Sequence, residues 1–182
     1  DLYKKYGIDS VEIENKVADW KKGLNKRLVD SFSIAFFRNQ EFRMPKYIEK
    51  LQSLNDKKNA QLFIWTFNNY GFPSTQKIGL WGSNNTFMPM GNILNHMAGL
   101  DNKDYPYFKE KILEYVKTGE CTPEDYAEMI DKRAYMEGKD CVYCTVSNSR
   151  ISDSTKINKN RKEIGMPALN HSKKINTDYL KK

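Results

Sequence analysis

The residue types that could carry catalysis are few in this chain. It has only two histidines, and His96 lies among apolar residues such as Leu94 and Met97. A general base needs a pKa near the working pH, and histidine has one without tuning. His96 is therefore the first catalytic candidate. Its apolar neighbours nevertheless favour a buried, hydrogen-bonded histidine, which we expect near the turn at residues 70–73.

A second group of candidates consists of Asp131, Arg133 and Tyr143. Asp131 and Arg133 are two residues apart on an expected helix, so their side chains do not face each other. One interpretation is a polar active-site pair. The favoured interpretation is structural: each side chain ties the helix to another element, and Asp131 binds the backbone of segment 141–145.

The cysteines Cys141 and Cys144 have the spacing of a redox pair or of half a zinc site. A redox pair usually lies at a helix N-terminus, whereas this pair follows a helix and lies on an expected strand. Structural zinc needs four ligands, so Cys121 with His96 or His171 would have to complete the set. We therefore expect inert cysteines and no metal. A reversible disulfide is the alternative, and Cys141, Cys144 and His96 are the remaining metal candidates.

Candidate ligands for Cu(I) are present at Met88, Met90, His96 and Met97. Methionines beside Phe87 and Leu94 are more typical of core packing. The chain has no phosphate-binding glycine loop, no Gly-x-Ser-x-Gly elbow and no His-Glu-x-x-His motif. We predict no cofactor.

Helices must position these residues. Apolar periodicity predicts helices in the first third of the chain, with Ser10 as a cap and an interruption at Pro45. A further helical region at 47–67 is expected to break near residues 55–56. Gly71 in the following turn provides a stop signal.

Later segments predict three more helices and a strand. A short helix within 86–100 carries His96, and a second helix covers 105–117. Thr122 caps the clearest helix, because proline and two acidic residues follow it, and Gly138 ends that helix.

Beyond Gly138, alternation at 141–146 predicts a strand, and 158–164 predicts a last helix. The predicted fold class is therefore mainly α. We expect a compact bundle of six to seven short helices around an aromatic core, with a small β-hairpin near residues 141–157.

Charge and length limit the broad class of protein. The 182 residues carry 30 basic and 23 acidic side chains, a net charge of +7, and the excess is mostly lysine. A basic tail can bind nucleic acid, but specific phosphate recognition favours arginine, so a solvated surface is the preferred interpretation. No apolar run reaches the roughly 18 residues of a membrane span.

The compartment is left open by the sequence. The chain begins at Asp1 without methionine, so we expect a mature or trimmed product, in which any signal peptide is no longer visible. A soluble protein of the cytoplasm or of the cell envelope fits equally. The odd number of cysteines argues against a disulfide framework.

Several short motifs occur in a fixed order between residues 46 and 170. They are Asp56 and Asn59, the turn at 70–73, the histidine segment 95–97, the pair Asp131 and Arg133, the dipeptide 138–139, Tyr143 and Thr145, and a terminal element with Asn158, Arg161, Met166, Pro167 and Leu169. This set resembles a bacterial family known only as a domain of unknown function. Members commonly carry aspartate at the position of Ala98 and glycine at that of Cys144. The resemblance supports the fold and implies no reaction.

The sequence thus predicts one globular domain, 1–182, with N-terminal helices (1–45), the family-like region (46–170) and a basic tail (171–182). The expected function is that of a bacterial non-enzymatic binding or interaction domain, of an immunity or accessory type, with a protein or small ligand as partner. The alternative is an uncharacterised hydrolytic enzyme with a pocket around His96, Asp131, Arg133 and Tyr143. Convergence of these four side chains on one pocket would distinguish the two.

Overall fold

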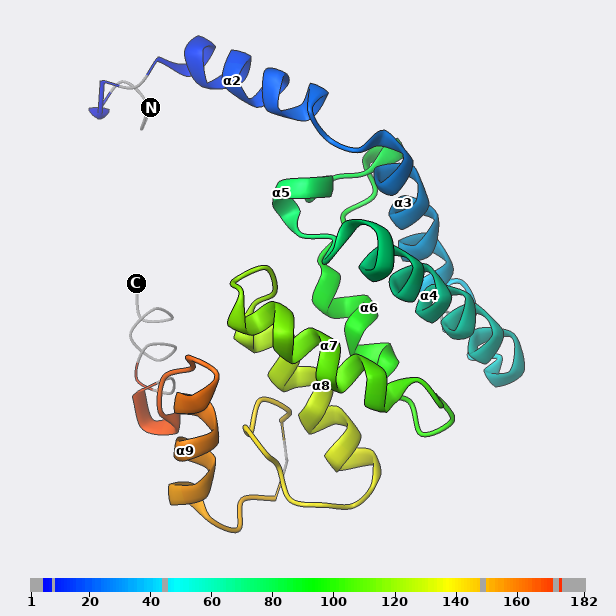
Figure 1. The fold of residues 1–182 in the computed structure, drawn as a ribbon, viewed down its shortest axis with the longest axis vertical. Helices are drawn as coiled ribbons and strands as arrows, with labels where there is room; N and C mark the ends of the chain where they lie inside the picture. Colours follow the sequence, from blue (N-terminus) through cyan, green and yellow to red (C-terminus); the bar gives the residue numbers. More distant parts are fainter. Residues whose placement is uncertain (1–4, 8, 44–45, 148–149, 172–173, 175–182) are drawn as a thin grey trace.

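The computed structural model describes residues 5–7, 9–43, 46–147, 150–171 and 174. Over these residues the chain is mainly helical, as predicted (Figure 1). The helices are α2 (Ser10–Lys22), α3 (Lys26–Gln40), α4 (Glu49–Tyr70), α5 (Thr75–Ile78), α6 (Met90–Met97), α7 (Tyr105–Lys117), α8 (Pro123–Met136) and α9 (Ser154–Glu163), with a 3-10 turn at Ser83–Asn85. None of the helices in this part of the chain is long and apolar enough to cross a bilayer. Most of the basic tail at 171–182 lies outside the described residues.

An aromatic core joins α3, α4 and α7. Phe32, Phe63 and Phe108 are fully buried. Phe63 lies edge-to-face with Phe32 at 5.2 Å and with Phe108 at 6.3 Å between ring centroids. This is the geometry that aromatic quadrupoles favour. The rings therefore fix the relative positions of three helices, as the predicted aromatic core requires.

Helices α6 and α8 pack closely because of a glycine. A Cβ atom on Gly91 of α6 would lie 2.2 Å from the Asp125 carboxylate on α8, so only glycine fits without a shift. At the start of α8 the Thr122 hydroxyl accepts a hydrogen bond from the Asp125 N–H at 3.1 Å, which confirms the predicted cap. This packing places His96 of α6 beside Lys132 of α8.

The expected break of α4 near residues 55–56 is wrong. Helix α4 is continuous, because these two polar side chains bond to the end of α3 and the segment after it. Asn55 donates to the carbonyl of Arg38 at 3.2 Å, and Asp56 pairs with Arg43 at 2.7 Å. Polar residues that resemble a turn signal in the sequence here bind α4 to the end of α3 and the segment after it.

Helix α2 extends away from the other helices (Figure 1). Its N-cap is Asp9, whose carboxylate accepts from the Val11 N–H at 2.9 Å, and not Ser10 as predicted. Gly23 ends α2, and Asn25 caps α3 with a hydrogen bond from the Leu28 N–H. No residue of α2 is buried.

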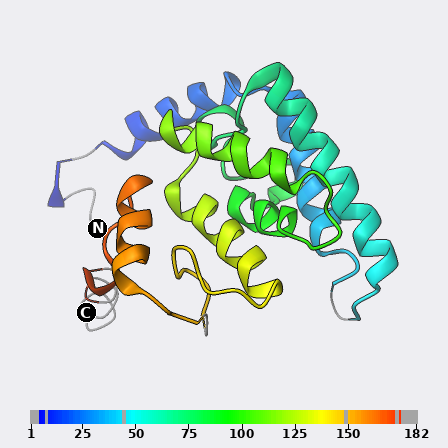
Figure 2. The same ribbon diagram turned by 60° about the horizontal axis from the view of Figure 1, so that its bottom comes forward.

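The predicted β-hairpin near 141–157 is also wrong. Residues 141–147 form bends and a turn, and the one bridge among the described residues joins Trp81 to Phe87. A backbone hydrogen bond from the Cys141 N–H to the Arg150 carbonyl closes the segment into a loop. Helix α9 then starts at Ser154, earlier than expected, with Asp153 as its cap. The loop folds back beside α8 (Figure 2).

Candidate functional site

Asp131 anchors this loop to α8. Its carboxylate is fully buried and accepts four hydrogen bonds. One oxygen accepts from the N–H groups of Val142 (2.7 Å) and Tyr143 (2.9 Å), and the other accepts from the N–H (2.7 Å) and the hydroxyl (2.8 Å) of Thr145. A buried carboxylate is tolerated when donors of this kind compensate its charge. These bonds confirm the expected structural clamp.

The same bonds explain why no strand forms. They occupy the backbone N–H groups that a neighbouring strand would otherwise bind. Cys144 adopts a left-handed conformation with φ of 56°, which turns the chain sharply. The turn brings residues 141 and 144 to the same side, whereas a strand would point them apart.

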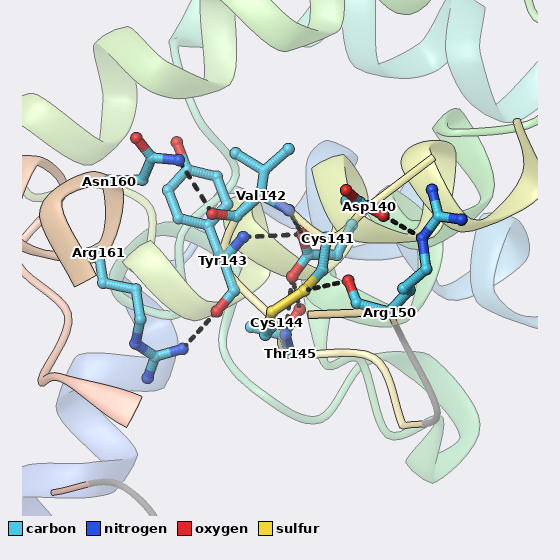
Figure 3. The surroundings of a disulfide bond; sticks show 10 residues. Asp140, Cys141, Val142, Tyr143, Cys144, Thr145, Arg150, Asn160 and Arg161 are labelled. Carbon is cyan, nitrogen blue, oxygen red and sulfur yellow. Dashed lines mark hydrogen bonds and ion pairs between the residues drawn. A yellow bond between two sulfur atoms is a disulfide. The ribbon is translucent and has the colours of Figure 1, made fainter. Parts of the chain in front are cut away.

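Cys141 and Cys144 are joined in a disulfide, with their Cα atoms 5.0 Å apart (Figure 3). The expectation that these two cysteines are inert thiols is therefore wrong. The disulfide bond of the alternative is present, and its reversibility stays a prediction. Cys121 is free and buried, and burial raises the pKa of its thiol.

Helix α9 binds the other side of the loop through backbone carbonyls. Arg161 is buried and donates to the carbonyl of Tyr143 at 2.7 Å and to that of Pro167 at 2.6 Å. Asn160 donates to the carbonyl of Val142 at 3.1 Å (Figure 3). The loop is thus held through its N–H groups by α8 and through its carbonyls by α9.

His96 lies in a different environment. It lines a pocket of about 850 Å³ together with Arg43, Asp56 and Lys132. Burial, reinforced by the charges of Lys132 and Arg43, lowers the pKa of His96 to about 3. The imidazole is therefore neutral near neutral pH. Its Nδ1 is 3.2 Å from the Lys132 ammonium, which has no acceptor, so Nδ1 accepts and Nε2 carries the hydrogen.

Lys132 is the residue that the sequence analysis missed. Burial, with a smaller effect of Arg43, lowers the pKa of its ammonium. Among the residues of the structure described above, Lys132 forms no ion pair, and its hydrogen bond goes to His96. The nearby carboxylate of Asp56 is engaged by Arg43 (2.7 Å) and by Gln52 (2.9 Å).

The expected position of His96 near the turn at 70–73 is wrong. His96 lies beside the first half of α4, where Ser53 and Asp56 line its pocket. Tyr70, at the other end of α4, is about 21 Å further along the helix axis from Asp56. The glycine-mediated packing of α6 on α8 sets this position.

Three of the four proposed catalytic residues are engaged in holding the structure. The Asp131 carboxylate accepts four hydrogen bonds from the loop. Arg133 donates to the carbonyl of Gly99 at 2.7 Å and stacks over Tyr105 at 4.8 Å. Tyr143 is buried against Tyr126. Of the four, His96 lines the pocket.

The metal candidates do not come together either. Over the described ranges, no three His, Cys, Asp or Glu side chains form a group that could hold a metal ion. His96 contacts Lys132, whereas Cys141 and Cys144 bond to each other. The soft-ligand candidates Met88, Met90 and Met97 belong to the hydrophobic core.

Comparisons with known proteins give no assignment for this chain. No family model matches the sequence, and no curated protein or solved structure matches it.

Proposed function

We propose that this protein is a non-enzymatic binding domain and that its ligand site is the Lys132 pocket, lined by Arg43, Asp56, His96, Asp101 and Lys132. One observation carries the proposal: a half-buried ammonium group, without an ion pair to any described residue, lines a pocket large enough for a small molecule. Taking a cation out of water without a counter-charge costs free energy. A bound anion would offset that cost.

The donors at the pocket favour a ligand with a carboxylate or phosphate group. Lys132 has N–H groups beyond the one that His96 accepts. The neutral His96 ring adds an Nε2–H donor. Asp101, another acidic residue of the lining, already accepts from the Ser53 hydroxyl at 2.7 Å. An anionic group would thus meet free donors, while two of the lining carboxylates, Asp56 and Asp101, are already bonded.

The alternative, a hydrolytic enzyme built on His96, Asp131, Arg133 and Tyr143, has less support. A general base works best with a pKa near the operating pH, and that of His96 is about 3. The Asp131 carboxylate has its acceptor positions filled by the loop. These two facts favour binding over catalysis.

Membership of the uncharacterised bacterial family, and with it an immunity or accessory role, is part of the proposal. Its support is that motif residues far apart in sequence meet at one place. Asp131 accepts from the backbone of Tyr143 and Thr145, and Arg161 donates to Tyr143. An ordered motif set is expected to hold such a cluster together. The partner, whether a protein or a small ligand, would present its anionic group to Lys132.

An NMR titration at pH 7 tests the binding site, with inorganic phosphate and acetate as separate probes. We expect the imidazole resonances of His96 to shift and saturate with at least one probe, and Lys132→Gln to abolish the shift. Lys58→Gln removes an exposed lysine of α4 that does not line the pocket and should respond like the wild type. A wild type that responds to neither probe, or an unchanged response in Lys132→Gln, would overturn the proposal.

A further inference from the structure

Helix α2 buries none of its residues, although the Trp20 ring near its C-terminal end lies close to Gly79. All of its 13 residues are at least partly exposed. An isolated helix of this length is marginal in water, because most helical stability in proteins comes from packing of an apolar face. Its apolar face is formed by Ile13, Val17 and Trp20, which are 38%, 41% and 41% exposed. Their spacing of four and three residues places them on one stripe.

The charges of α2 divide into two groups. Lys16 pairs with Glu12 at 2.5 Å, and Lys22 pairs with Asp19 at 2.9 Å. Glu14 and Lys21 form no ion pair within the part of the chain that the structure describes. They are separated by two helical turns and therefore flank the same edge of the apolar stripe.

We propose that α2 is a self-association helix that pairs antiparallel with α2 of a second copy of this chain. Antiparallel pairing about a two-fold axis brings the apolar stripes together. It also sets Glu14 of each copy opposite Lys21 of the other, so both unpaired charges acquire partners.

The charge pattern selects this orientation over the parallel one. In a parallel pair, flanking residues five positions apart meet across the interface. Lys16 would then face Lys21 of the second copy, and Asp9 would face Glu14. Both contacts join like charges, so the parallel arrangement is disfavoured.

An apolar groove beside α2 extends the contact surface. This groove, of about 760 Å³, is lined by Val17, Trp20 and Leu24 from the α2 side and by Leu80 and Trp81 from the body of the protein. Trp81 is 61% exposed. Because one short helix and the groove beside it form the whole proposed contact, we expect a reversible dimer with a roughly micromolar dissociation constant. This inference is independent of the Lys132 pocket, which lies on α4, α6 and α8.

Sedimentation velocity of the full chain over a concentration series tests the apolar stripe. We expect the wild type to dimerise with increasing concentration and Val17→Glu to stay monomeric. Val11→Glu is the matched control, because Val11 is 60% exposed on roughly the opposite face of α2. Both variants should fold, since α2 buries no residue. A wild type that is monomeric throughout, or equal effects of the two substitutions, would overturn the proposal.

A charge exchange tests the orientation. Glu14→Lys and Lys21→Glu should each weaken dimerisation about tenfold, because each sets like charges opposite one another at two places. The double variant recreates both pairs with reversed sign and should recover the wild-type constant. Failure of the double variant to recover, or single variants without effect, would refute antiparallel pairing.

Discussion

Asp131 and Lys132 are neighbours on α8, yet they have opposite environments. The Asp131 carboxylate is fully buried and accepts four hydrogen bonds from the loop that follows α8. The Lys132 ammonium is half-buried, bonds to His96 and lines an open pocket. One helix therefore carries a saturated charge on one side and an unsaturated charge on another.

The difference indicates how to separate structural from functional polar residues. A buried charge with all of its hydrogen bonds made stabilises the fold and has no capacity left for a ligand. A desolvated charge with free donors destabilises the empty protein slightly and gains from binding. On this basis Asp131 holds the structure and Lys132 binds.

The largest expected loss of stability follows from removing the hydrogen bonds of Asp131. Asp131→Asn keeps the shape of the side chain but replaces one acceptor oxygen with a donor amide, which cannot bind the N–H groups of the loop. We expect the free energy of unfolding to fall by about 3 kcal/mol, as measured by urea denaturation. Asp104→Asn is the matched control, because the Asp104 side chain makes no capping bond, and it should change stability by less than about 0.5 kcal/mol.

A smaller effect is expected in the pH dependence of stability, through His96 in the Lys132 pocket. The pKa of His96 falls from its ordinary 6.5 to about 3 in the folded protein. The unfolded chain therefore binds a proton below about pH 6.5 that the folded chain rejects, so stability is lost as the pH falls towards 3. Allowing for partial exposure, we expect His96 to account for about 2 kcal/mol of the loss between pH 7 and pH 4.

Urea unfolding at a series of pH values measures this contribution as the difference between the wild type and His96→Asn. The variant should show the shallower slope. His171→Asn removes the exposed histidine and should keep the slope of the wild type. Equal slopes for the wild type and His96→Asn would show that His96 is freely solvated, which would remove the contrast between the two sites.

The N-cap of α8 is an exposed hydrogen bond, so its loss should affect stability less than either change above. Thr122→Ala removes the N-cap of α8 and should cost about 1 kcal/mol, the usual value for such a cap. Thr155→Ala, in the first turn of α9, removes an exposed hydroxyl at a position where the backbone N–H makes the capping bond. It should have almost no effect on the urea midpoint. Equal effects of the two substitutions would mean that α8 does not depend on its cap.

Much of the helical fold could be predicted from local signals. The Thr122 cap, the glycine stop at Gly71 and the apolar periodicity around Phe63 act within a few residues of each other. The errors arise where a distant residue decides the outcome. Asn55 looked like part of a turn, but its side chain bonds to Arg38 and Glu41, and α4 is continuous. Alternation at 141–146 suggested a strand, but backbone N–H groups of this segment donate to the Asp131 carboxylate and are not available to a neighbouring strand.

The candidate site was predictable only in part. The binding of the loop backbone by Asp131 could be predicted, because an acidic side chain lies on a helix shortly before that loop. The role of Lys132 did not, because a lysine on a surface helix gives no sign of what faces it. Its environment depends on the packing of Gly91 against Asp125, which brings His96 to its side.

The most direct test of the account is the unfolding free energy of Lys132→Gln, measured beside that of Asp131→Asn. If Lys132 is an unsaturated charge kept for binding, its neutralisation should leave stability within about 0.5 kcal/mol of the wild type or raise it slightly. If Lys132 instead holds the structure as Asp131 does, Lys132→Gln should lose about as much stability as Asp131→Asn. That result would contradict the division of α8 into a structural charge and a binding charge.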